Sequence, residues 1–368
     1  MKFIPTLLLR SAAVAFCVAA TILLAGCRRG GGRVLEIAYV SGVQANLRDH
    51  VAAVYEKAGV VKNGERVEVL DRDRRFVRVR TATGVTGWVE QRYLVSQDVY
   101  DRIQKLTADN QNDPVQAKGA TRNDTNLHVE PGRDTEHLYQ ISSGEKLLLL
   151  KRGTAEKGGA VAPAPRPATP AGNPPNSNPQ NNDRKQPEPA IEDWWLVRDS
   201  HDRVGWVLAR MIDLDVPLDV AQYAEGQRIV AFFVLNQVQD GDKKVAQYLS
   251  VVTEPKDGLP FDFNQIRVFT WNVKRHRYET AYRERMEGVL PVTVAQENFD
   301  KEGVLPAFTI RVQDDKGTVS ERKYKLNTPI VRRVYAPGEE PVRTVSRKAV
   351  SRKTVSKKAV GRKAKRKR

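Results

Sequence analysis

Cysteine is almost absent from this 368-residue chain: Cys17 and Cys27 lie in the first 27 residues, and none follows. That scarcity excludes a disulfide framework and a zinc site built from thiolates. The five histidines, at positions 50, 128, 137, 201 and 276, have no spacing typical of a metal site. The sequence also lacks a glycine-rich phosphate loop and a Gly-x-Ser-x-Gly motif. We therefore expect no metal, no cofactor and no enzymatic activity.

Acidic residues are absent from the C-terminal segment 343–368, which contains 13 lysines and arginines. The rest of the chain therefore carries only about +4 of the formal net charge of +17. The segment repeats the pattern TVSRK, AVSRK, TVSKK, and a valine at every fifth position fits neither a helix nor a strand. We expect a disordered basic tail over 335–368. It either attracts polyanions, such as lipopolysaccharide, acidic wall polymers or DNA, or has no specific partner. Its candidate polyanion-binding residues are Arg347, Lys348, Arg352, Lys353, Lys357, Lys358, Arg362, Lys363, Lys365, Arg366, Lys367 and Arg368.

The N-terminus begins with basic residues, followed by an apolar run from Ser11 to Leu24 that is short for a membrane span. The run ends in Leu24-Ala25-Gly26-Cys27, which resembles the lipobox of bacterial lipoproteins. The resemblance implies that 1–26 is a signal peptide, that Cys27 carries the lipid and that 27–34 is a tether. The alternative is an uncleaved anchor helix. In either case we expect an extracytoplasmic protein on a bacterial membrane, the outer membrane facing the periplasm being favoured over the inner one.

The triplet Gly-Trp-Val occurs at 87–89 and again at 205–207. Around it, Val79-Arg80 matches Val197-Arg198 at an offset of 118 residues. Two copies of so specific a pattern indicate a repeated module. We interpret Gly87, Trp88, Gly205 and Trp206 as structural residues of a closing strand, with both tryptophans in the core.

Upstream pairs match at a smaller offset, as Asn46-Leu47 does with Asn126-Leu127, 80 residues later. The difference of 38 residues equals the length of 153–190, which is rich in proline and asparagine and has no aromatic residue. We therefore expect the second module to contain a disordered insert over 153–190. The insert includes a P-x-x-P spacing at Pro167 and Pro170, which could fold back onto a barrel as polyproline II.

Residues 35–95 contain short runs of alternating apolar and polar side chains separated by turns, which predicts a small β-barrel. The stretches Ala45–Arg48, Lys62–Leu70 and Phe76–Val89 resemble the bacterial SH3 domain family. The resemblance implies a barrel that binds peptidoglycan or a protein of the envelope. Segment 96–113 predicts a helical spacer, and 120–213 predicts a second barrel of the same kind.

Exposed aromatic residues form the shallow ligand groove of SH3-type barrels. The candidates here are Phe76 and Tyr93 in the first copy and Trp194 and Trp195 in the second. Because adjacent strand residues point to opposite faces, we expect only one of the two tryptophans in the core.

The region 216–334 consists of strand-like runs and turns and predicts an antiparallel β-sandwich-like domain. Its hairpin from Trp271 to Tyr278 interleaves basic and aromatic residues, which favours cross-strand packing over polymer binding. The whole chain is thus predicted to be all-β, with two SH3-like barrels joined by a short helix. We expect a membrane-anchored binding or scaffold protein whose barrels engage peptidoglycan or an envelope protein. The alternatives are polyanion binding through the tail and a hydrolase activity in 216–334. The sequence leaves the oligomeric state open.

Overall fold

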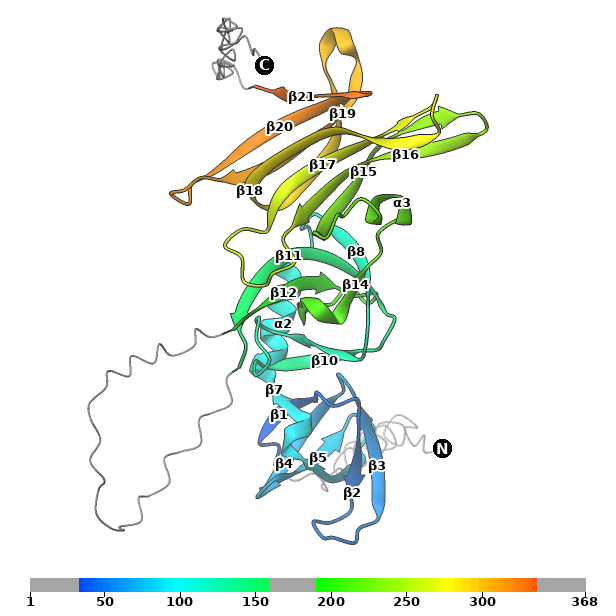
Figure 1. Ribbon diagram of the computed structural model, residues 1–368. Helices are drawn as coiled ribbons and strands as arrows, with labels where there is room; N and C mark the ends of the chain where they lie inside the picture. The colour runs from blue at the N-terminus through cyan, green and yellow to red at the C-terminus, as the bar shows by residue number, and fades with distance from the viewer. Residues whose placement is uncertain (1–32, 159–189, 336–368) are drawn as a thin grey trace, which may run out of the picture.

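The computed structural model describes residues 33–158 and 190–335 (Figure 1). The predicted signal peptide with Cys27, the basic tail and most of the predicted insert lie outside the described residues. Within them, no helix is both long enough and apolar enough to cross a membrane. The described chain folds into three antiparallel sheets of seven strands each, accompanied by two helices, so the all-β prediction is confirmed.

The first barrel is built from short strands whose alternate residues are buried, as in the pattern eBiBi of Thr86–Glu90. Its core is small and made largely of valine. In spatial order its strands are β3 (Lys57–Lys62), β2 (Gln44–Arg48), β6 (Thr86–Glu90), β5 (Phe76–Thr81), β4 (Arg66–Asp73), β1 (Glu36–Val40) and β7 (Leu94–Ser96). A 3₁₀ turn, η1 (Gln91–Tyr93), precedes β7.

The second barrel has the same strand order, element for element. It runs β10 (His137–Ile141), β9 (Thr125–His128), β13 (Val204–Leu208), β12 (Ile191–Arg198), β11 (Lys146–Glu156), β8 (Ala117–Thr121) and β14 (Ile212–Leu214), with η2 (Ala209–Met211) before β14. The two cores match at the offsets read from the sequence. The buried pairs are Leu47 with Leu127, Val61 with Ile141, Val67 with Leu147, Val69 with Leu149, Val77 with Trp195, Val79 with Val197 and Val89 with Val207.

The Gly-Trp-Val triplet is arranged differently from our interpretation. Glycine and valine are buried, whereas Trp88 and Trp206 are only half-buried on the opposite face of the strand. A Cβ atom on Gly87 would lie 2.7 Å from Cβ of Leu47, and one on Gly205 would lie 2.7 Å from Cβ of Leu127. The glycines therefore permit close approach of a buried leucine, and the tryptophans are not core residues.

The insert is shorter than predicted. Gly153–Glu156 continues strand β11 and pairs with Ile191–Trp194 of β12. In the first barrel the corresponding pair, Asp73 with Phe76, ends its hairpin at a two-residue turn. The second hairpin therefore extends beyond this point, so the predicted start at residue 153 is wrong; ladder hydrogen bonds hold these residues in the sheet.

Helix α2 (Gln97–Asp109) lies between the barrels and runs beside the second one (Figure 1). Its buried residues Val99 and Ile103 pack with Tyr39 of the first barrel and Leu138 of the second. The turn at Asn63 adds a polar contact, because its side chain donates to Leu138 O at 2.8 Å and accepts from Gln140 N at 3.2 Å. The helix and this turn hold the barrels together.

The third sheet is an uninterrupted meander rather than a sandwich of two sheets. Its strands are β15 (Arg228–Asp240), β16 (Lys243–Thr253), β17 (Phe263–Asn272), β18 (Arg277–Asn298), β19 (Val304–Gln313), β20 (Val319–Asn327) and β21 (Ile330–Val334), with α3 (Leu218–Ala221) before them and η3 (Asp300–Glu302) within. Strand β18 pairs with β17 along its first half and with β19 along its second, with the change at Gly288 and an irregular register between Val289 and Thr293. Bulges of this kind bend a strand. The sheet consequently curves over its own core and needs no second layer.

The curved sheet packs directly on the second barrel, as Figure 1 shows. One hydrophobic cluster runs from Trp195 and Ile212 of the barrel into Val230 and Phe308 of the sheet. The buried Gln116 accepts a hydrogen bond from Val292 N at 2.8 Å. The second barrel is therefore enclosed on two sides, by α2 and by the sheet.

Candidate functional site

A cavity of about 310 Å³ opens on the first barrel beside the end of strand β2. Polar and aromatic side chains form much of its wall. Its lining residues are Gln44, Ala45, Asn46, Arg48, Tyr55, Val89, Glu90, Arg92 and Tyr93. We call this cavity the Arg48 groove.

Arg48 is the central residue of the groove. Its guanidinium lies over the ring of Tyr55, 4.1 Å from the centroid, and 4.8 Å from the centroid of Phe76. It also contacts Glu90, with Nη2 3.4 Å from Oε1. The planar group is thus held between two rings and a carboxylate, an arrangement that orients it.

Glu90 and Tyr93 are linked by Arg92, which is largely exposed. Arg92 Nε lies 2.9 Å from Glu90 Oε2, and its guanidinium covers the ring of Tyr93 at 4.8 Å. The groove therefore combines two tyrosine rings, each covered on one face by a guanidinium group, with one carboxylate. Such a surface suits a ligand with flat polar groups and charges of both signs.

A second cavity, of about 490 Å³, lies on the other side of Arg48. Arg74 and Arg75, the two residues of the β4–β5 turn, line it together with Phe76 and the segment Val51–Ala53. Arg48 thus divides a longer surface whose outer part is cationic.

Of the four predicted ligand aromatics, only Tyr93 lies in the wall of the Arg48 groove. Phe76 is 5% exposed and lies beneath Arg48, so it supports the groove rather than presenting a face. Trp194 and Trp195 are 2% and 7% exposed. The expectation that one of these tryptophans is exposed is wrong, because both faces of β12 are covered.

The second barrel has a closed surface where the first has its groove. His128 occupies the position of Arg48, and its ring meets Trp194 edge-on at 5.2 Å. Thr135, at the position of Tyr55, lies with Oγ1 3.0 Å from His128 Nδ1. Burial, together with the neighbouring His137, lowers the pKa of His128 to about 4, so it is neutral at pH 7.

Ion pairs hold the loop over this surface in place. Arg133 donates to both carboxylate oxygens of Glu192, and this pairing holds the pKa of Glu192 below its ordinary value. Arg102 of α2 reaches Glu130 at 2.8 Å and Glu136 at 2.5 Å. The helix and the extended β11–β12 hairpin thus fasten the loop that in the first barrel carries Tyr55.

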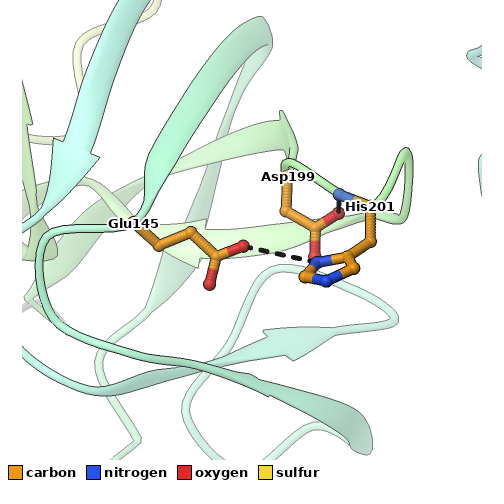
Figure 2. Close-up of side chains that lie close together, drawn as sticks. All are labelled: Glu145, Asp199 and His201. Atoms are coloured by element: carbon orange, nitrogen blue, oxygen red, sulfur yellow. Dashed lines mark hydrogen bonds and ion pairs between the residues drawn. The ribbon is translucent and has the colours of Figure 1, made fainter.

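One cluster of potential metal ligands occurs among the described residues, formed by Glu145, Asp199 and His201 (Figure 2). His201 Nδ1 lies 3.6 Å from Glu145 Oε1. Asp199, however, already accepts from the backbone N of His201 and Arg203, both at 2.9 Å, and from Arg203 Nε at 2.7 Å. A carboxylate engaged in this way and paired with a guanidinium is a poor ligand for a cation.

The first barrel shows what Asp199 does. At the matching turn, Thr81 Oγ1 accepts from Val85 N at 3.2 Å. Both turns also share a backbone bond, from Thr81 N to Val85 O and from Asp199 N to Arg203 O. We therefore assign Asp199 a role in forming its turn.

Sequence reasoning missed Arg48, Tyr55, Glu90 and Arg92. Tyr55 lies in the Asp49–Lys57 loop, where no apolar period marks a wall residue. The signal for Arg48 was present: it follows Asn46-Leu47 in the matched run, and the same alignment places His128 opposite it.

A family model described as a bacterial SH3 domain matches residues 42–95. These residues include the whole Arg48 groove. The first barrel is similar to bacterial SH3 domains, and this likeness suggests cell-wall binding. The match does not extend to the second barrel. No curated protein matches the sequence.

Solved structures that match the chain include an NlpC/P60 family protein from Bacillus cereus, with 12% identity, a TM-score of 0.21, and coverage of 80% of this chain and 95% of that one. NlpC1 from Trichomonas vaginalis matches with 10% identity, a TM-score of 0.16, and coverage of 79% and 88%. NlpC2 from the same organism matches with 10% identity, a TM-score of 0.16, and coverage of 81% and 95%.

These matches correct one expectation. We predicted that the chain is not an enzyme, and this is contradicted because the matched structures belong to a family of cell-wall hydrolases. The prediction is withdrawn. At such TM-scores the likeness carries no argument for a particular reaction or for a catalytic residue in this chain.

Proposed function

We propose that this chain is a membrane-anchored extracytoplasmic protein that binds peptidoglycan through the Arg48 groove of its first barrel. The observation that carries the proposal is the open groove itself, in which Tyr55, Tyr93, Arg48, Arg92 and Glu90 surround one cavity. Peptide stems of a wall polymer present flat amide groups with charges of both signs, and aromatic faces beside guanidinium and carboxylate groups complement them. An envelope protein is the alternative ligand.

The second barrel, in this proposal, is a further copy of the same domain that has become structural. Its shared strand order and matched core support common descent. Its matching surface is closed by His128, Trp194 and the loop fastened to α2. It would therefore position the first barrel and connect it to the curved sheet.

Anchoring is the least direct part of the proposal and rests on the lipobox-like Leu24–Cys27. A lipid on Cys27 would place the first barrel nearest the membrane, because it follows the short tether. Metabolic labelling with a fatty-acid probe tests this, with Cys27→Ser as the variant and Cys17→Ser as the control. Equal labelling of both variants would contradict attachment at Cys27.

A pull-down with purified sacculi tests wall binding. The described body, residues 33–335, should sediment with sacculi, and Arg48→Gln should reduce its apparent affinity by about tenfold, because the groove loses its central cation for a ligand carboxylate. Arg66→Gln is the matched control, since Arg66 lies on β4 outside the groove and is half exposed. Absence of sedimentation, or equal loss in both variants, would exclude the wall as the ligand of this groove.

The basic tail supports a second, additive role. Its 13 positive charges would attract polyanions with an affinity that falls steeply as salt rises. Deleting 336–368 should therefore abolish binding to lipopolysaccharide at low salt and leave sacculus binding by the body unchanged. Retention of lipopolysaccharide by the shortened chain would show that the tail is not the segment that binds it.

A further inference from the structure

Another cavity, of about 590 Å³, lies where the second barrel meets the curved sheet. This volume is within the range of small-ligand sites. The barrel contributes residues of β11, β12, η2 and β14, and the sheet contributes the start of β15 and the end of β16. The lining residues are Arg122, Arg152, Asp193, Trp195, Ala209, Arg210, Ile212, Leu214, Arg228, Ile229, Val230, Thr253, Pro255 and Asp257. We call it the junction cavity.

Arginine is the most frequent charged residue in the junction cavity. Four arginines and two aspartates line it, while Asp213 and Glu192, which pair with Arg122 and Arg210, lie outside the lining. The remaining wall is mostly apolar. A site of this composition favours an anion that also has an apolar part.

Two of the arginines hold the two domains together. Arg152 is buried and donates to Asp193 Oδ2 at 2.6 Å and to the carbonyl oxygen of Phe261 at 2.9 Å. Arg228 reaches the same oxygen of Asp193 at 2.8 Å and Asp257 Oδ1 at 2.9 Å. Their charges are committed to carboxylates at the junction.

The other two arginines contribute nothing comparable to the junction. Arg210 has a side chain that is 60% exposed, and its ion pair with Glu192 is 3.9 Å long, beyond hydrogen-bonding distance. Glu192 already accepts hydrogen bonds from Nε and Nη2 of Arg133. Arg122 bonds through Nε and Nη2 to Asp213, a residue of its own barrel. Neither guanidinium group is needed to hold the barrel and the sheet together, and both line the cavity.

The opposite wall is built for an apolar group. Trp195, Ile212 and Val230 lie together in the hydrophobic cluster that spans the junction, and Leu214 packs against it. In the first barrel a valine, Val77, occupies the position of Trp195. Thr253 adds a buried hydroxyl that has no hydrogen-bond partner among the described residues.

We propose that the junction cavity binds a small organic carboxylate, with Arg210 and Arg122 holding the carboxylate and the Trp195 wall holding an apolar side group. The bonds of Arg152 and Arg228 pre-organise the cavity floor, so binding requires no domain movement. The basic tail of the chain has the wrong charge to occupy it. This site shares no lining residue with the Arg48 groove, so its test does not depend on wall binding.

Calorimetric titration of the full chain with N-acetyl-leucine tests the proposal, with N-acetyl-leucinamide as the uncharged probe and inorganic phosphate as the anion without an apolar group. We expect saturable binding of N-acetyl-leucine, at least about tenfold weaker binding of the amide, and weak binding of phosphate. Quenching or a shift of tryptophan emission should accompany it, because Trp195 lines the cavity.

Arg210→Gln should weaken N-acetyl-leucine binding by about tenfold without changing the melting temperature, because the side chain is exposed. The matched control is Arg66→Gln, a partly exposed arginine on β4 that lines neither this cavity nor the Arg48 groove and should bind as the unmodified chain does. No saturable binding, equal affinity for acid and amide, or equal loss in both variants would overturn the site. Phosphate binding as tightly as N-acetyl-leucine would overturn the apolar half of it.

Discussion

In the first barrel, Arg48 lies between Tyr55 and Phe76 at the edge of an open cavity. In the second, His128 has the same place in the strand order and is packed against Trp194 and Thr135. Seven buried core positions of the two barrels match in register, so much of the difference lies in what covers them. One barrel has an open groove at this position, and the other uses the matching surface for packing.

The covering elements explain the divergence. The second barrel contacts α2 on one side and the curved sheet on the other, and its β11–β12 hairpin is extended. Each neighbour buries apolar area and would be costly to remove. Among the described residues, the first barrel contacts α2 and, through Tyr39 and its Asn63 turn, the second barrel. Within that part of the chain, its loop 49–56 has no ion pair to another element like that of Arg133 with Glu192.

The largest loss of stability should come from substituting the glycine of the Gly-Trp-Val triplet, which approaches a buried leucine in both barrels. Gly205→Val should destabilise the second barrel by about 3 kcal/mol, because the new side chain overlaps Leu127 and the backbone at His128 cannot retreat. Gly87→Val should do the same to the first barrel through Leu47. Hydrogen exchange measured by mass spectrometry on β9 and β2 would report each loss locally. Unchanged protection in either variant would show that the close approach is dispensable.

Acidification should lower the stability of the second barrel through a group that the first barrel lacks. The pKa of His128 is about 4 in the folded chain and 6.5 in an unfolded one, so the unfolded chain binds this proton more readily. The resulting stability is fully present above pH 6.5 and is lost as the pH falls towards 4. We expect the second barrel to lose about 2 kcal/mol over this range, after allowance for partial exposure.

The same exchange experiment at pH 7 and pH 5 measures this, with β9 and β13 compared with β2 and β6. The His128→Asn variant keeps a donor near Thr135 and removes the titrating group, so it should abolish the pH dependence of the second barrel. If the variant retains that dependence, another group is responsible.

Substitutions at Tyr55 and at Thr135, which occupy matching loop positions, should affect ligand binding differently. Tyr55→Ala removes a half-buried ring from the wall of the Arg48 groove and should weaken sacculus binding by about tenfold, or about 1.4 kcal/mol. Thr135→Ala, at the corresponding place in the second barrel, should leave binding unchanged. Similar losses in both would mean that the second barrel also contacts the ligand.

The shared features of the barrels could be predicted from sequence because they are local and periodic. The offsets of 80 and 118 correctly paired core residues such as Val69 with Leu149 and Val79 with Val197. The strands of the third region were also recognisable, yet their single curved sheet was not. That shape depends on the bend at Gly288, where the ring of Phe263 occupies the space of a side chain.

The site could not be predicted in the same way, because exposure is decided by elements distant in sequence. Trp194 and Phe76 occupy matching positions, but only the structure shows that the first supports a closed surface and the second an open one. Trp195 is covered by a sheet that begins more than thirty residues later along the chain. The alternation of side chains along a strand predicts which residues lie on the same face of the sheet, but it does not predict which face is exposed to solvent.

The smallest difference concerns the turns that precede β4 and β11. Asn63 bonds Ser41 O of its own barrel and, in addition, Leu138 O and Gln140 N of the second, whereas Ser143, at the matching position, bonds Arg122 O within its own barrel. Asn63→Ala should therefore loosen the contact between the barrels by about 1 kcal/mol, the usual net value of such bonds. Ser143→Ala should not. Faster exchange confined to the β10 edge in Asn63→Ala, and its absence in Ser143→Ala, would show that the open barrel is held in place by this turn as well as by α2.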